Sequence, residues 1–150
     1  IPHFTLENFM LVRLMYVSRA ADSVNQNELV AILKKSKANN VNVGVTGVLC
    51  FSAGIFLQVL EGGRSAVSSL YNKIANDPRH HDVVLLSYEE VNERNFAGWS
   101  MGRANLARLN PSLVMKYSET ALLNPYAVSG KMSMALFNEM VASAAIICDS

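Results

Sequence analysis

The chain has little of what marks several common classes of protein. Only 17% of its 150 residues are charged, and 13 basic against 12 acidic residues give a formal net charge of +1. A charge so close to balance gives no electrostatic reason to expect a nucleic acid or a membrane surface as a partner. The longest late apolar run, Met140 to Cys148, is shorter than the roughly 20 residues that a membrane-spanning helix needs. The first residues lack the basic start and the cleavage site of a signal peptide.

Cysteine is scarce as well. Cys50 and Cys148 are the only two, and neither has a cysteine or histidine partner at ligand spacing. This pattern argues against a disulfide framework or a zinc site, and it predicts reduced thiols in a cytoplasmic protein. The adjacent His80 and His81 lack a third ligand at metal spacing, so no metal site is expected there either.

The sequence also lacks the familiar catalytic motifs. It contains no G-x-S-x-G elbow, no H-E-x-x-H pair, no Walker loop and no G-x-G-x-x-G turn. No acid–base pair stands out, and we therefore expect a protein that is not an enzyme. What is present is apolar: 51% of the residues are hydrophobic, which is enough for one folded core.

Hydrophobic periodicity predicts an alternating series of strands and helices. Strands are predicted over Leu11–Ser18, Val45–Ser52, Ile55–Glu61, Val83–Tyr88 and Trp99–Leu106. The strand at Val83–Tyr88 reads as buried, and the last strand is expected to carry Trp99, Met101 and Arg103 on one face. One helix is expected to begin after an Asn25 cap, with Glu28 completing a capping box, and to end near Asn39-Asn40. A second is expected over Arg64–Asn76, stopped by Pro78.

This order predicts an α+β fold, a ferredoxin-like sandwich with a five-stranded mixed sheet and two helices on one face. Ala53-Gly54 suits a two-residue hairpin between the second and third strands. Pro111 suits the start of a tail helix, and a helical stripe follows at Met132, Leu136, Phe137, Met140, Val141 and Ala144. The tail helices are expected to cover the other sheet face or to offer a partner surface. The expected division is an N-terminal extension, native or added, over residues 1–10, a domain over 11–107 and a helical cap over 108–150.

Three polar positions are candidates for chemistry. Gln58 lies between Phe56 and Leu60 on a strand face that should meet the core, where an unpaired amide is costly. Tyr16 lies on the inward face of the first strand, and Asn39-Asn40 end the first helix. Each position also has a purely structural explanation: a backbone hydrogen bond for the glutamine, core packing for the tyrosine and a helix stop for the asparagines.

Charged residues gather at the end of the second helix, at Lys73, Asp77, Arg79, His80 and His81. They suit either contact with a phosphate group or a solvated helix end, in which Lys73 and Asp77 form an i,i+4 pair.

Six ordered blocks of sequence resemble the BLUF family, the blue-light sensors that use flavin. The blocks are RLMYVS at 13–18, ILKKSKANN at 32–40, GVTGVLCF at 44–51, FLQVLEG at 56–62, DPRHH at 77–81 and FAGWSM at 96–101. The resemblance covers roughly residues 11–106. Many relatives carry arginine where this chain has Lys73, which keeps the charge but lacks the planar fork.

The resemblance implies an oxidised flavin bound without a covalent bond, either FAD or FMN and usually FAD, with its ring between the two helices. Tyr16 and Gln58 would be the photoactive pair, and Trp99 and Met101 the switching residues. The cofactor-binding positions implied are Ile32, Ser36, Asn39, Asn40, Phe56, Gln58, Leu60, Lys73, Ile74, Asp77, Arg79 and His80. Light would drive electron and proton transfer from Tyr16 through Gln58, which would be left rotated or tautomerised.

The resemblance to short BLUF proteins also implies self-association and a light-dependent protein partner such as a response regulator or transcription factor. Three alternatives remain at this stage. A phosphate enzyme of the acylphosphatase type would need a phosphate loop that places an arginine near an asparagine, and Arg13 and Asn39 do not form a recognisable one. An RNA-binding module would need aromatic and basic residues on its sheet, and a flavin enzyme would need room for a substrate.

Overall fold

The computed structural model describes residues 10–104, 111–120, 124–142 and 146–147. The secondary structure elements in chain order are β1 (Leu11–Ala20), α1 (Gln26–Val43), β2 (Thr46–Ser52), β3 (Ile55–Gly63), α2 (Arg64–Ala75), β4 (His80–Val91), β5 (Gly102–Ala104), α3 (Pro111–Met115), α4 (Gly130–Ala142) and β6 (Ile146–Ile147). Within these residues no helix has the length and apolar character that crossing a membrane would require.

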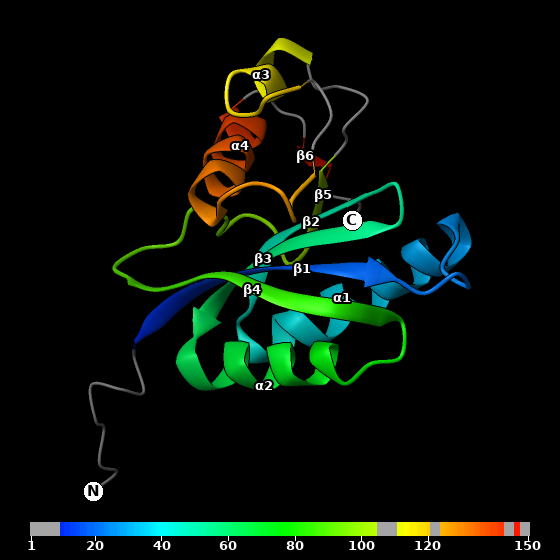
Figure 1. The fold of residues 1–150 in the computed structure, drawn as a ribbon. Coiled ribbons are helices and arrows are strands. Elements are labelled where there is room, and N and C mark those ends of the chain that lie inside the picture. The colour runs from blue at the N-terminus through cyan, green and yellow to red at the C-terminus, as the bar shows by residue number, and fades with distance from the viewer. Residues whose placement is uncertain (1–9, 105–110, 121–123, 143–145, 148–150) are drawn as a thin grey trace, which may run out of the picture.

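One mixed sheet forms the centre of the molecule, in the order β4-β1-β3-β2-β5-β6. The pairs β1–β3, β1–β4 and β2–β3 are antiparallel, whereas β2 and β5 are parallel. Helices α1 and α2 cover one face, and α4 lies on the other side (Figure 1). The ferredoxin-like prediction is confirmed, and the two-residue strand β6 adds a sixth strand to the five expected.

Two apolar clusters hold the layers together, one on each face of the sheet. The cluster beneath α1 and α2, called here the helix-side core, includes Leu14, Tyr16, Leu33, Leu60 and Met101. The opposite cluster, called the cap-side core, includes Met15, Val17, Leu57, Val59, Phe96, Leu136 and Phe137. Adjacent residues of β1 and β3 therefore serve different cores, as the two-residue period of a strand requires. The cap-side core confirms that the tail covers the second face.

Local signals explain where α1 begins and ends. The Asn25 side chain accepts a hydrogen bond from the backbone N–H of Glu28 at 2.9 Å, which caps the helix as predicted. The helix does not end near Asn40 but continues to Val43, where Gly44 adopts the left-handed conformation with φ of 70°. Glycine has no Cβ to oppose that conformation, so Gly44 rather than the asparagines is the stop.

The predicted buried strand is instead a half-exposed edge. β4 spans His80–Val91, and among the described strands it is paired only with β1. Val84, Leu85 and Tyr88 are 43%, 48% and 44% exposed. The apolar composition was misleading because an edge strand extends beyond the layers that cover the centre of the sheet.

Candidate functional site

A cavity of about 220 Å³ lies between α1 and α2 above the helix-side face of the sheet. Its lining combines apolar side chains, amides, a phenol and charged groups. The lining residues are Tyr16, Ile32, Lys35, Ser36, Asn39, Asn40, Leu49, Phe56, Gln58, Leu70, Lys73, Ile74, Asp77, Arg79 and His80. Every cofactor-binding position named from the sequence lies on this wall except Leu60, which is fully buried beneath it in the helix-side core.

Tyr16 and Gln58 are directly opposite each other on β1 and β3. The Tyr16 hydroxyl donates a hydrogen bond to Oε1 of Gln58. The Gln58 amide Nε2 in turn donates to the Met101 sulfur at 3.2 Å. Tyr16, Gln58 and Met101 are 1%, 6% and 1% exposed, so they form a buried polar chain that runs from two residues of the cavity wall to Met101 in the helix-side core.

Burial controls the protonation of Tyr16. Desolvation raises the pKa of its phenol far above the ordinary value of 10, and the nearby Tyr71 and Asp77 add to the rise. The phenol is therefore neutral at physiological pH and keeps its proton available for the bond to Gln58.

Asn40 joins α1 to the segment that precedes β5. Its side chain is 2% exposed, and Nδ2 donates to the backbone carbonyl of Ser100 at 2.9 Å. The neighbouring Asn39 is largely exposed, but it also lines the cavity. The extra turn of α1 explains why Asn40 is buried inside a helix rather than placed in a loop.

The charged end of the cavity is organised by Asp77 and Arg79. The Arg79 guanidinium donates to both carboxylate oxygens of Asp77, with a closest contact of 2.6 Å. These bonds lower the pKa of Asp77 to about 2. His80 is mostly buried nearby with its Nδ1 2.7 Å from the Ser18 hydroxyl, and desolvation lowers its pKa to about 4. His80 is accordingly neutral at pH 7.

The two expected switching residues are not on the same face. Met101 is 1% exposed and belongs to the helix-side core, whereas Trp99 packs against the cap-side core. The regular strand β5 begins only at Gly102, so the alternation assumed from Trp99 to Arg103 does not apply. The proposed strand end at Leu106 and domain boundary at residue 107 lie outside the described residues.

Three lining residues were not among the cofactor-binding positions named from the sequence: Lys35, Leu49 and Leu70. Leu49 is paired with Gln58 across β2 and β3, so the strand register would have identified it. Leu70 precedes Ile74 by four residues and Lys35 precedes Asn39 by four, so helical spacing was the available signal.

The lining suits a flavin in its chemistry. Ile32, Leu49, Phe56, Leu70 and Ile74 offer apolar surface for a flat ring, and Asn39, Asn40 and Gln58 offer amides for a polar ring edge. Lys73, Arg79 and Lys35 supply positive charge for phosphate groups. Arg13 does not contribute, because it pairs with Glu61 under the cap-side face. The Arg13–Asn39 pair that an acylphosphatase-like site needs is therefore not assembled.

Known proteins share this architecture and sequence. The family model for BLUF, described as sensors of blue-light using FAD, matches residues 11–102. The photoactivated adenylate cyclase subunit beta of Euglena longa is 37% identical over 95 residues, covering 63% of this chain and 11% of that protein. The alpha subunit of Euglena gracilis is 40% identical over 84 residues, covering 56% and 8%. The chain thus spans only about a tenth of the length of these relatives.

Two solved structures align with nearly the whole chain. BlsA in its photo-activated state gives a TM-score of 0.78 at 28% identity, covering 88% of this chain and 95% of that one. The BLUF protein BlrB in its dark state gives 0.75 at 30% identity, covering 90% and 97%. The family model covers more than half of the chain and the fold matches, so the chain belongs to the BLUF family of flavin-binding blue-light sensors.

Proposed function

We propose that this chain is a blue-light photoreceptor that binds oxidised FAD in the cavity between α1 and α2 and signals to a protein partner. The observation that carries the proposal is the buried hydrogen-bonded chain that begins at Tyr16 and Gln58 on the cavity wall and ends at Met101 behind it. Tyr16 is a proton donor, the Gln58 amide can exchange its donor and acceptor ends, and the Met101 sulfur is a weak acceptor. The hydrogen bonds of these side chains can change without unfolding the sheet.

The lining divides into three roles. The apolar side chains of the lining would enclose the ring, Asn40 with Asn39 and Ser36 would bind its polar edge, and Lys73, Asp77, Arg79 and His80 would surround the ribityl and phosphate end. Arg79 is already paired with Asp77, which leaves Lys73 and Lys35 as the more available cations. FAD differs from FMN by a second phosphate and an adenosine.

A bound flavin supplies absorption of blue light and, when excited, acceptance of an electron. Tyr16 would donate that electron and release its hydroxyl proton through Gln58 along their hydrogen bond. The electron and proton then return to the tyrosine, and the Gln58 amide is left rotated or tautomerised, with its donor and acceptor ends exchanged. Its former donor end no longer faces the Met101 sulfur in the same way.

The energies in this exchange are small. One neutral hydrogen bond contributes about 0.5–1.5 kcal/mol net, and a tenfold change in a population needs about 1.4 kcal/mol. Several contacts must therefore change together before a partner is released or captured. We propose that this change in contacts is shared by Met101 on one face of the sheet, Trp99 on the other face and the helices over the cap-side core.

The output in this proposal is a contact with another protein, and this chain performs no catalysis. The related adenylate cyclases carry their similar region within much longer chains. A response regulator or transcription factor is proposed as partner, with self-association of the chain and a cytoplasmic location.

The test is an absorption spectrum of the purified protein before and just after blue light. Wild type is expected to show an oxidised flavin spectrum that shifts to the red and relaxes in darkness, and the flavin released by denaturation is expected to be FAD by chromatography. Tyr16→Phe removes the hydroxyl that bonds Gln58, so it should bind flavin but lose the shift.

Tyr71→Phe is the matched control. Its ring lies 5.8 Å from that of Tyr16 and packs against the helix-side core, so the variant removes a hydroxyl of the same kind from beside the photoactive pair. It should keep the red shift. A colourless wild-type protein that stays colourless with added flavin, or a Tyr16→Phe protein that shifts normally, would contradict the proposal.

A further inference from the structure

Residues 92–101, called here the crossover segment, connect β4 to β5 across the cap-side face of the sheet. Strands β1, β3 and β2 lie between these two strands in the sheet order. Along this path Phe96 is fully buried in the cap-side core. Arg13 contacts the Glu93 carbonyl at 3.4 Å, and Arg94 donates to the Thr46 hydroxyl at 3.0 Å. The segment is thus attached to strands that it crosses.

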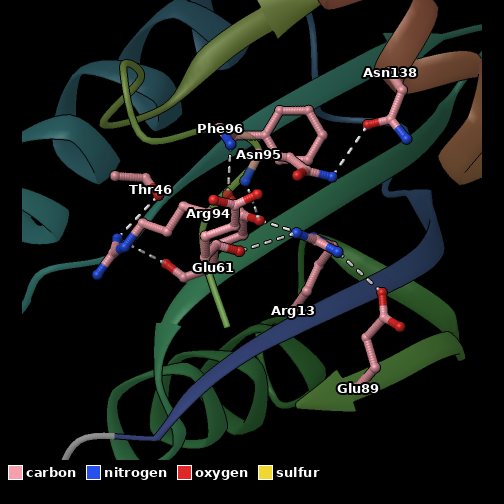
Figure 2. A network of polar contacts seen from close by, with 9 residues as sticks. Arg13, Thr46, Glu61, Glu89, Arg94, Asn95, Phe96 and Asn138 are labelled. Atoms are coloured by element: carbon pink, nitrogen blue, oxygen red, sulfur yellow. Dashed lines mark hydrogen bonds and ion pairs between the residues drawn. The ribbon is translucent and has the colours of Figure 1, made fainter. Parts of the chain in front are cut away.

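The central attachment is a buried carboxylate on β3. Glu61 is 0% exposed, and its oxygens accept hydrogen bonds from the backbone N–H groups of Asn95 at 2.8 Å and Phe96 at 2.6 Å. Arg13 neutralises it through Nε at 2.8 Å (Figure 2). A buried carboxylate is costly unless it is paired and fully hydrogen-bonded, so these bonds depend strongly on one another.

The same segment ends at the photoactive pair. Five residues after Phe96, the Met101 sulfur accepts the bond from Gln58 at 3.2 Å. Between them, Trp99 bonds back to the Phe96 carbonyl at 3.2 Å, and its own carbonyl accepts from Gly47 at 2.9 Å. These hydrogen bonds restrict the movement of the segment between Phe96, which Glu61 holds, and Met101.

The anchor also reaches the C-terminal layer. The Asn95 side chain contacts the Asn138 amide oxygen on α4 at 3.4 Å (Figure 2). The Phe96 ring packs edge-on against Phe137 of α4 with centroids 6.4 Å apart. Asn95 and Phe96 therefore make both kinds of contact: their backbone N–H groups bond Glu61, and their side chains contact α4.

From this arrangement we infer that Glu61 is a positioning residue for the light response: it fixes the crossover segment so that Met101 stays against Gln58 and a change there is passed to α4. On β3, Glu61 lies three residues after Gln58. Its partner on β1 is Arg13, which lies three residues before Tyr16. Glu61 and Arg13 lie on the opposite face of the sheet from Tyr16 and Gln58. Glu61 acts through the segment and does not touch the cavity. The inference rests on the proposed photochemistry.

The experiment compares Glu61→Gln with Glu89→Gln in the full chain loaded with flavin. Glu89 bonds the same Arg13 at 3.0 Å but is 51% exposed and holds no backbone of the segment, so it is the matched control. Glu61→Gln should speed the dark recovery of the red-shifted state about tenfold, equivalent to about 1.4 kcal/mol, because a loosened segment resists the return of Gln58 less. Glu89→Gln should stay within about twofold of wild type.

A second readout does not depend on photochemistry. Trp99 is the only tryptophan, so its fluorescence and its quenching by acrylamide report the position of the segment. Glu61→Gln should increase the quenching in darkness and Glu89→Gln should not. If Glu61→Gln fails to fold, Glu61→Asp keeps the charge but shortens the reach to the Asn95 and Phe96 amides, and the same changes are expected.

The outcomes separate this inference from the proposed function. A wild type that binds flavin but shows no red shift removes the proposed photochemistry, and the tryptophan readout still tests the anchor. A wild type that responds normally, with folded Glu61 variants matching Glu89→Gln in both recovery and quenching, overturns the positioning role alone.

Discussion

At the scale of single residues, two separate sets of buried polar groups lie on the two faces of the sheet. Tyr16, Gln58 and Asn40 face the cavity, while Arg13 and Glu61 lie beneath the crossover segment. Both sets are hydrogen-bonded, as buried polar groups must be. The cavity set uses neutral partners, which can exchange donors for acceptors at small cost, whereas the opposite set uses full charges that resist separation.

His80 gives a prediction for pH dependence. Its pKa is about 4 in the folded protein because of burial, against an ordinary value near 6.5. Between these values the unfolded chain binds a proton that the folded one does not, so stability should fall as pH drops from about 6.5 to 4 and be unaffected above that window. Because His80 is only partly buried, solvent should reduce the loss to about 1–2 kcal/mol, measured by urea unfolding followed by circular dichroism.

Variants of the two adjacent histidines separate this effect from general acid unfolding. His80→Gln should flatten the curve between pH 6.5 and 4, whereas replacement of the exposed His81 by glutamine should alter it only slightly, because the charge of His81 is the smallest cause of the lowered His80 pKa. Asp77, with a pKa near 2, contributes below this window, where its stabilising pair with Arg79 is lost. An unchanged slope in His80→Gln would show that another group is responsible.

At the scale of elements, the β2–β3 hairpin is tightly specified by its turn. Ala53 and Gly54 both have positive φ, 51° and 74°. This conformation fits the type I′ turn of a two-residue hairpin, and it keeps Leu49 opposite Gln58. Alanine is a poor residue for its position, because its Cβ opposes the left-handed conformation.

Substitutions in this turn should act in opposite directions. Ala53→Asn should stabilise the protein by about 0.5–1 kcal/mol, because asparagine tolerates positive φ. Gly54→Ala should destabilise it by about 1–2 kcal/mol. Thermal unfolding should show Tm rising and falling by about 2–4 °C per kcal/mol. A loss of stability in Ala53→Asn would contradict this account of the turn.

At the scale of the whole molecule, the sheet separates a ligand layer from a cap layer. The cavity lies on the helix-side face, while Phe137 is fully buried in the cap-side core. The crossover segment is the connection that contacts both. Damage to one layer should therefore be distinguishable from damage to the other.

Phe137→Ala should lower the free energy of unfolding by about 3–5 kcal/mol but leave flavin affinity within about threefold of wild type. Ile74→Ala, on the half-buried cavity wall, should weaken flavin binding about tenfold, or about 1.4 kcal/mol, with a smaller loss of stability. Denaturant unfolding and flavin titration check the pair. Equal losses of affinity in both variants would contradict the separation of layers.

The sequence by itself determined the local elements and the family. The hydrophobic period specifies β1, the Asn25 cap specifies the start of α1, and the Ala53-Gly54 turn specifies the β2–β3 hairpin. Each of these signals acts between residues that are close in the chain. The same pattern placed Tyr16 and Gln58 inward. Their role as a photoactive pair is a prediction from the family resemblance.

Tertiary structure alone decided the rest. Whether β4 is central or an edge depends on which strands pair with it, and composition does not record pairing. Trp99 and Met101 separate onto two faces because the segment before β5 bends around hydrogen bonds from Gly47 and Asn40, both far away in sequence. The role of Glu61 was invisible for the same reason: a single acidic residue after a strand gives no sign that distant backbone amides will surround it.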